Sequence, residues 1–134
     1  KGYESPICET IEKTHASYNA GLEFCLDNIA DIYVSNATHN EESCKMMVEW
    51  MEEKKIAKNN PRTATAQLIG MSDNISFVMA EAGYNIEKYV PYGPVKHVLP
   101  YLIRRTQENT SVGGQMSREM NLIHTEMKRR KLLK

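Results

Sequence analysis

The chain has 134 residues, of which 41% are hydrophobic and 25% are charged, a composition typical of a globular domain. Its 17 basic and 17 acidic residues cancel, so no net charge attracts it to nucleic acid, and no apolar run approaches the roughly 18 residues that span a membrane. The three cysteines, Cys8, Cys25 and Cys44, lack C-x-x-C spacing, which favours reduced, partly buried thiols in an intracellular compartment over a disulfide or zinc framework.

The first part of the chain predicts a helix, a strand and a second helix. Residues 8–28 form the first predicted helix, and its apolar face consists of Ile11, Ala16, Tyr18, Leu22, Cys25 and Ile29. A short strand rich in β-forming residues is expected over 32–35. Asn40 suits the N-cap of a helix from Glu41 to about Lys55. The buried stripe of that helix comprises Met46, Met47, Trp50 and Met51, which we interpret as core residues rather than a cofactor site.

Two further strand–helix units follow. The first has a strand over 63–69 and a helix over 75–82, which Asp73 or Asn74 caps and Gly83 ends. Strands that alternate with helices indicate a parallel sheet. Three parallel strands are too few for a barrel or a doubly wound sheet, so we expect this chain to be part of a larger fold.

The last unit begins with a strand over 87–90 and a Pro-Tyr-Gly-Pro turn. Pro94 suits the start of the helix that follows, whereas Pro100 is expected to kink this helix or to move its start further along. A glycine-rich linker is expected over 110–115, before a final helix over 116–134. The apolar residues of the final helix are Met120, Ile123, Met127 and Leu132.

The helix after Pro94 carries the candidate binding residues. Its helical spacing places Tyr101, Arg104, Arg105 and Glu108 on one stripe. A guanidinium group binds a carboxylate through two parallel hydrogen bonds, so this stripe suits a small carboxylate ligand. In isolation, an adjacent arginine pair is more often a solvated charged surface.

The amino-acid sequence of this segment resembles that of a known family. Residues 89–109 read YVPYGPVKHVLPYLIRRTQEN, which closely resembles the last strand and helix of proline dehydrogenase, the FAD-dependent enzyme of proline catabolism. The resemblance implies that Tyr89, Tyr101, Arg104 and Arg105 surround the substrate. It places Glu108 at an acidic position of the family one turn later, which we assign to cofactor binding.

Two shorter blocks extend the resemblance. The run Ala-Thr-His-Asn at 37–40 is similar to the family's flavin-contacting block, which implies that His39 contacts the cofactor and that Thr38 and Asn40 support it. The run at 67–71 implies that Leu68 packs against the substrate ring. Read without the resemblance, the first block is equally a helix-capping motif and the second is a generic buried strand.

The resemblance implies the last three strand–helix units of a (β/α)8 TIM-like barrel in residues 1–109, with a linker and C-terminal helix in 110–134. The implied reaction is FAD-dependent oxidation of L-proline to Δ1-pyrroline-5-carboxylate, with electrons passed to a quinone. Neither a catalytic nucleophile nor a metal is expected. The sequence of this segment is closer to the animal mitochondrial forms than to the bacterial fusion enzymes. This similarity implies that the protein lies on the matrix side of the inner mitochondrial membrane, with peripheral membrane association.

The pattern departs from the family in one respect. The family also uses a lysine, an aspartate and an arginine from earlier barrel strands, and this chain has no counterpart of them. Two alternatives remain: a hydroxyproline dehydrogenase, and a truncated, non-catalytic interaction domain. The hydroxyproline enzymes tend to carry a smaller residue at the position of Tyr89, so this tyrosine favours proline.

Overall fold

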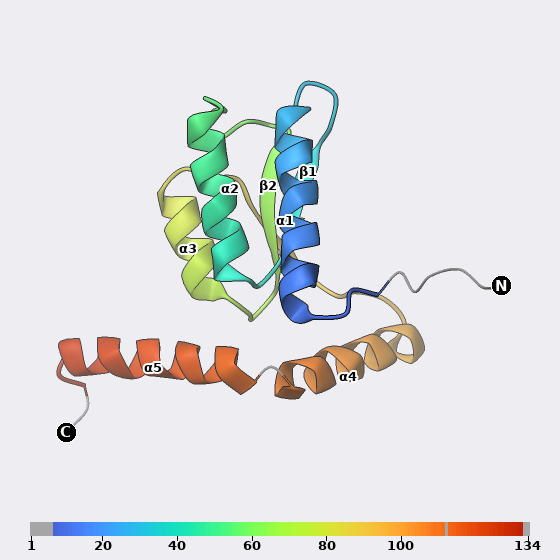
Figure 1. Cartoon of the computed structure of the whole chain (residues 1–134). Coiled ribbons are helices and arrows are strands. Elements are labelled where there is room, and N and C mark those ends of the chain that lie inside the picture. Colours follow the sequence, from blue (N-terminus) through green and yellow to red (C-terminus); the bar gives the residue numbers. More distant parts are fainter. Residues whose placement is uncertain (1–6, 112, 133–134) are drawn as a thin grey trace. The chain divides into compact units, whose positions relative to one another are not determined.

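The computed structural model describes residues 7–111 and 113–132, without the side chains of 106, 108–111 and 113–119. The chain forms two compact units, Lys1–Tyr89 and Val90–Lys134. The first unit holds three strand–helix elements, and the second holds two helices (Figure 1). The domain boundary that we expect at residue 109 stays a prediction.

The first unit is built on a parallel sheet of three strands in the order β1-β2-β3. The strands are β1 (Val34–Ala37), β2 (Thr63–Leu68) and β3 (Ile86–Tyr89). The helices α1 (Ile11–Asp27), α2 (Glu41–Glu53) and α3 (Asp73–Glu81) lie together over one face of the sheet (Figure 1). The predicted alternation of helices and parallel strands is therefore confirmed, as an α/β fold.

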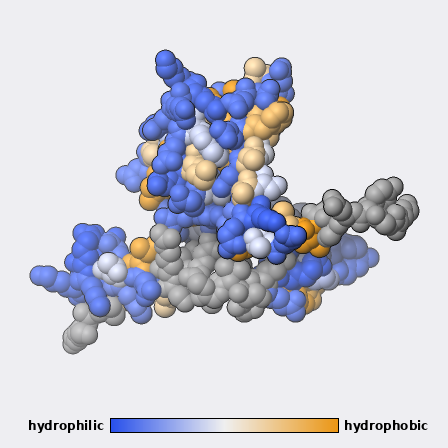
Figure 2. Space-filling view, in the orientation of Figure 1, coloured by the Kyte–Doolittle hydropathy of each residue, from blue (hydrophilic) through white to orange (hydrophobic). Residues whose placement is uncertain are grey.

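The hydrophobic core lies between this helical layer and the sheet. Its buried side chains are Leu22, Leu26, Val34, Cys44, Met47, Met51, Ile75, Met79 and Tyr84. Met47 and Met51 are each 2% exposed, as expected for the stripe of α2. The outer surface of the helical layer is largely hydrophilic (Figure 2). This amphipathic pattern fixes which face of each helix meets the sheet.

None of the helices that the structure describes in the first unit covers the opposite face of the sheet. Successive side chains of a strand point to opposite faces, so Ser35 and Ala37 point away from the helices while Val34 and Asn36 are buried beneath them. The same alternation leaves Tyr89 on the uncovered face, with 54% of its surface exposed. We call this side of the sheet the open face.

Several predicted boundaries of the first unit need correction. The first strand begins at Val34, not at residue 32, because the amides of Asp31 and Ile32 donate to the carbonyl of Asn28 in a turn that follows α1. The helix α1 begins at Ile11 because the Thr10 hydroxyl caps it. The predicted apolar face of α1 is only partly right, since Leu22 and Leu26 are its buried residues.

The start of α3 also differs from the prediction. Ser72, rather than Asp73 or Asn74, is the N-cap residue, and its backbone has φ 51° and ψ 37°, in the left-handed region. Its side chain makes no capping hydrogen bond to the helix. Gly83 follows the helix with φ 92°, as expected for a helix-ending glycine.

The second unit consists of α4 (Val95–Ser111) and α5 (Gly113–Arg129). The helix α4 begins where predicted, and the Pro94 carbonyl accepts hydrogen bonds from its first turn. Pro100, expected to kink this helix or to move its start further along, lies inside α4, so the later start is wrong. The expected linker over 110–115 is also wrong, because helix occupies most of it. A glycine costs a helix only about 1 kcal/mol, so glycine content alone does not define a linker.

Candidate active site at the carboxyl edge of the sheet

The carboxyl ends of the three strands meet at one edge of the sheet because all three strands are parallel. This edge carries the block 37–40 after β1, Leu68 at the end of β2 and Tyr89 at the end of β3. Leu68 and Tyr89 are register partners in the ladder between β2 and β3. The first unit therefore brings together five of the predicted site residues: Thr38, His39, Asn40, Leu68 and Tyr89. In barrel enzymes the carboxyl edge of the sheet is the face that carries the active site.

Thr38 and Asn40 shape the turn on which His39 lies. The Thr38 hydroxyl accepts a hydrogen bond from the Asn40 amide at 3.0 Å, and Asn40 Oδ1 accepts one from the Glu42 amide at 3.0 Å. Asn40 is thereby confirmed as the N-cap of α2. The two side chains hold the strand-to-helix turn, which is the capping interpretation that the sequence left open.

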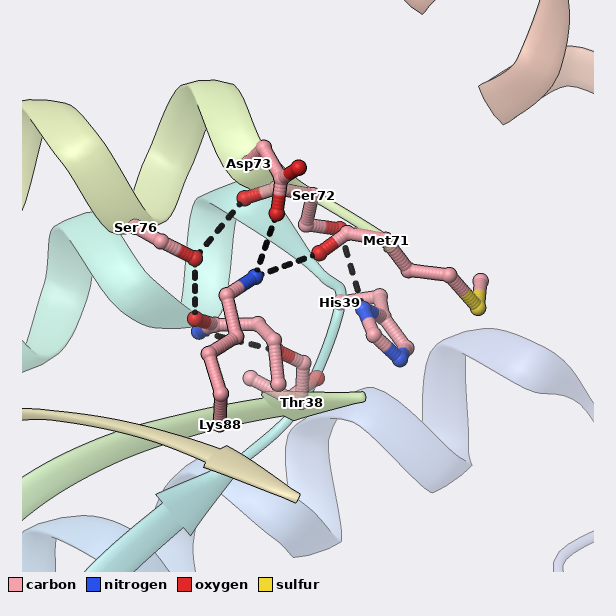
Figure 3. Close-up of polar contacts among 8 residues, drawn as sticks. Thr38, His39, Met71, Ser72, Asp73, Ser76 and Lys88 are labelled. Atoms are coloured by element: carbon pink, nitrogen blue, oxygen red, sulfur yellow. Dashed lines mark hydrogen bonds and ion pairs between the residues drawn. The ribbon is translucent and has the colours of Figure 1, made fainter. Parts of the chain in front are cut away.

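His39 is held from the neighbouring loop. Its Nδ1 atom lies 2.9 Å from the Oγ atom of Ser72, which is 3% exposed (Figure 3). The Ser72 carbonyl accepts hydrogen bonds from the amide and the hydroxyl of Ser76, both at 3.1 Å. This arrangement links the end of β1 with the start of α3.

A buried glutamine continues the link to β2. The Ser76 hydroxyl lies 2.8 Å from Gln67 Oε1, and Gln67 Nε2 donates to the Thr38 carbonyl at 3.4 Å. Gln67 is 2% exposed on the helical side of β2. A buried amide needs hydrogen-bond partners, and these contacts supply them.

The third strand contributes a lysine to the same cluster. Lys88 Nζ donates to the Met71 carbonyl and to Asp73 Oδ1, each at 2.8 Å (Figure 3). These two residues flank Ser72 in the chain. The ammonium group therefore holds the backbone carbonyl before Ser72 and the side-chain carboxylate after it.

The open face below this edge is hollowed. A cavity of about 570 Å³ is lined by Ser35, Ala37, Ala66, Glu87, Lys88 and Tyr89. Its volume falls within the range of about 300–1,000 Å³ that is common for ligand pockets. The small side chains of Ser35, Ala37 and Ala66 line it over β1 and β2.

A carboxylate on the open face forms its own hydrogen-bonded group. Glu87 accepts hydrogen bonds from the Tyr33 hydroxyl at 2.7 Å and from the Ser35 hydroxyl at 3.2 Å. The hydrogen bond to Glu87 raises the pKa of Tyr33, because ionisation would remove the proton that Tyr33 donates to Glu87. This interaction ties β3 to the segment that leads into β1.

The remaining predicted residues lie on α4, in the second unit. The Arg105 guanidinium carbon lies 5.3 Å from the centre of the Tyr101 ring, a distance typical of a cation–π contact. Tyr101 and Arg105 are half-buried, whereas Arg104 is exposed. The shared stripe predicted for Tyr101 and Arg105 is confirmed. Glu108 belongs to α4, but its side chain lies outside the described residues.

The sequence did not point to Ser72, Lys88, Gln67 or the Tyr33–Glu87 pair. One signal was present, since a glutamine within a predicted buried strand requires a polar partner. The other contacts join residues 15 to 54 positions apart and depend on strand register.

Among the residues that the structure describes, no group of three or more potential ligands suits a metal ion, and no helix is long and apolar enough to cross a membrane.

Comparison with known proteins points to one family. The sequence model described as proline dehydrogenase matches residues 1–118. Proline dehydrogenase 2, mitochondrial, of Arabidopsis thaliana is 42% identical over 132 residues, which cover 96% of this chain and 28% of that protein. Proline dehydrogenase 1, mitochondrial, of Homo sapiens is 43% identical over 132 residues, covering 96% of this chain and 22% of that protein.

A relative with another name is equally similar. Hydroxyproline dehydrogenase of Xenopus laevis is 42% identical over 134 residues, which cover 97% of this chain and 29% of that protein. The chain thus spans between a fifth and a third of the length of these relatives.

A solved structure shares the fold. Proline utilization A from Bdellovibrio bacteriovorus, inactivated by N-propargylglycine, superposes with a TM-score of 0.73 and 28% identity. The match covers 81% of this chain and 11% of that one. The α/β arrangement of parallel strands and helices is therefore similar to that of a protein named proline utilization A.

Proposed function

Because the chain belongs to the proline dehydrogenase family, we propose that it is part of an FAD-dependent enzyme that oxidises L-proline to Δ1-pyrroline-5-carboxylate and passes the electrons to a quinone. The observation that carries the proposal is the convergence of Thr38, His39, Asn40, Leu68 and Tyr89 at one edge of a parallel sheet, above a cavity on the open face. The whole fold that we propose is a (β/α)8 barrel, of which this chain supplies the last three strand–helix units.

The residues divide into a cofactor group and a substrate group. His39 contacts the flavin, with Thr38 and Asn40 holding its turn, and the alanines of the open face leave space for the ring system. Glu108 belongs to the cofactor group by its position in the family pattern. When bound, the flavin supplies the hydride acceptor for the oxidation.

The substrate group binds both parts of proline. Arg104 and Arg105 hold the carboxylate, and the contact between Arg105 and the Tyr101 ring restricts the guanidinium before ligand arrives. Leu68 and Tyr89, which are adjacent in the ladder, cover the apolar ring. These residues bind and orient the substrate and exclude water, while none of them needs to act as a nucleophile.

The second candidate function is oxidation of hydroxyproline. The Xenopus laevis hydroxyproline dehydrogenase is as similar to the chain as the proline enzymes are. Tyr89 favours proline, because its ring occupies the space that a hydroxyl group on the substrate ring requires. We therefore place proline first.

The names of the relatives also support a location. Several of them are mitochondrial proline dehydrogenases, so we propose a mitochondrial enzyme on the matrix side of the inner membrane, with peripheral membrane association.

A full-length family enzyme that carries this sequence tests the function. The purified protein should show flavin absorbance and should reduce a quinone analogue when L-proline is added. A higher kcat/KM with trans-4-hydroxy-L-proline would favour the second candidate. A flavin-containing protein that is inactive with both substrates would contradict the proposal.

A further inference from the structure

Ser72 combines two features that its local sequence does not require. It is not a glycine, yet its backbone lies in the left-handed region, with φ 51° and ψ 37°. It occupies the N-cap of α3, yet its hydroxyl makes no capping hydrogen bond to the helix. Both features cost free energy locally. A strained residue beside a candidate site is an indication of function rather than of stability alone.

The hydroxyl of Ser72 is directed to His39 instead. The distance of 2.9 Å to Nδ1 is that of a good hydrogen bond, and the serine is buried. In a neutral imidazole one ring nitrogen carries the proton and the other accepts. The serine hydroxyl can donate to Nδ1 or accept from it, so the role that the hydroxyl takes selects the tautomer, while the bond itself holds the ring in place.

Lys88 holds the strained residue in place. Its ammonium group bonds to the carbonyl of the preceding residue, Met71, and to the carboxylate of the following residue, Asp73, both at 2.8 Å (Figure 3). The side chain is only 26% exposed, so these bonds are shielded from bulk water in part. The next residue of β3 is Tyr89. Lys88 therefore lies beside Tyr89 of the proposed substrate group in the chain, while its side chain reaches the loop that contacts His39 of the proposed cofactor group.

We propose that Ser72 and Lys88 are positioning residues: Ser72 fixes the ring and tautomer of His39 through Nδ1, and Lys88 fixes the backbone of Ser72. In this arrangement Nε2 faces the bound ligand in a single role, either as a hydrogen-bond donor or as an acceptor. The inference rests on the proposed function for its ligand, the flavin, but the link between Ser72 and His39 can be measured without any ligand.

The first test measures the tautomer of His39 by NMR in a full-length enzyme carrying this sequence, labelled with ¹⁵N-histidine and freed of flavin. The wild-type protein should show one dominant tautomer for His39. Ser72→Gly removes the hydroxyl but suits the positive φ, so it should fold and should change the tautomer ratio about two- to tenfold, as expected for the loss of one hydrogen bond. Lys88→Met should change the tautomer ratio in the same direction, whereas Lys88→Arg, which keeps the positive charge, should retain the wild-type ratio.

Matched controls separate this effect from a general loss of structure. Ser17→Ala removes an exposed hydroxyl on α1, and Lys45→Met removes an exposed lysine that pairs with Glu49 at 3.6 Å. Neither should move the His39 signals. Unchanged His39 signals in a folded Ser72→Gly protein would overturn the proposal.

The second test measures the flavin midpoint potential in the loaded enzyme. His39→Ala and Ser72→Gly should each shift the potential with the same sign, and the double variant should shift it no further than His39→Ala alone, because Ser72 acts through His39. Additive shifts would overturn the positioning role. An unchanged potential in His39→Ala would instead reject the proposed flavin contact, while the NMR result would still decide the link between Ser72 and His39.

Discussion

Leu68 and Tyr89 lie directly opposite each other at the ends of β2 and β3. Partners in neighbouring strands are about 4.8 Å apart, and both side chains lie on the open face of the sheet. Two residues that are 21 positions apart in the chain therefore form one continuous surface beside the cavity. This adjacency is consistent with the family resemblance, from which we assign both residues to the substrate ring.

Tyr89 should control the choice between proline and hydroxyproline. In the full-length enzyme, Tyr89→Ser should lower kcat/KM for L-proline and raise the relative rate with trans-4-hydroxy-L-proline. A single small group in a pocket changes the discrimination by about 1–3 kcal/mol, or roughly five- to 150-fold. Steady-state kinetics with both substrates measures the ratio. Tyr92→Ser, at a 97% exposed residue of the following turn, is the matched control, and an unaltered ratio in Tyr89→Ser would reject the assignment.

Arg105 should anchor the substrate carboxylate. Arg105→Met removes a charge-assisted hydrogen bond worth about 1.5–3 kcal/mol, so kcat/KM for L-proline should fall about ten- to a hundredfold or more. Arg129→Met is a suitable control, since Arg129 is an exposed residue of α5 that pairs with Glu126. Normal kinetics in the Arg105 variant would show that this arginine belongs to a solvated surface.

Asn40 should stabilise the turn that carries His39. Its side chain caps α2, and replacing such a cap by alanine costs about 0.5–2 kcal/mol. Denaturant unfolding of the full-length enzyme should therefore show a lower midpoint for Asn40→Ala, whereas Asn40→Asp should retain most of the stability. If Asn40→Ala unfolds at the wild-type midpoint, the capping bond contributes nothing measurable.

Cys44 should react slowly with alkylating reagents. The side chain is 2% exposed, and burial raises the pKa of its thiol to about 11. Because only the thiolate reacts, iodoacetamide at pH 8 should modify Cys44 at least about tenfold more slowly than Cys8 or Cys25, which are partly exposed. Peptide mass spectrometry of the folded protein measures the three rates, and rapid modification of Cys44 before unfolding would contradict the burial argument.

The same thiol predicts a pH dependence of stability. Folding raises its pKa above the ordinary value of 9.0, so the folded state holds the proton more tightly than the unfolded state. The contribution is complete below pH 9 and is lost as the pH rises toward about 11. Cys44→Ala should flatten the fall in unfolding free energy over this window, and an unchanged slope would show that other groups cause it.

Residues 1–134 expressed alone should form neither a stable barrel nor an active enzyme. The strands β1 and β3 are edges of the sheet, and the open face exposes Tyr33 and Tyr89, each at 54%. Open edges and exposed apolar surface promote aggregation, and folding free energies are only about 5–15 kcal/mol. Light scattering, flavin absorbance and proline-dependent dye reduction test this expectation. A monomeric, yellow protein that oxidises proline would contradict it.

The sequence by itself determined most of the secondary-structure elements of the first unit. Helical and strand periodicities are local, so they predicted three strand–helix units, the Asn40 cap, the core residues Met47 and Met51 and the shared stripe of Tyr101 and Arg105. These features depend on residues within one turn or one segment. Helical spacing also brought the candidate residues of α4 onto one stripe, whereas the other candidate residues of the site came from the family resemblance.

Only the tertiary structure decided which distant residues meet. The register of β2 and β3 places Leu68 beside Tyr89, and the packing of α3 brings Ser72 to His39 and Lys88 to both neighbours of Ser72. The tertiary structure alone also shows the strand boundaries, the left-handed backbone of Ser72 and the Tyr33–Glu87 hydrogen bond. These contacts join separate segments, and their geometry depends on register and packing that local sequence preferences do not fix.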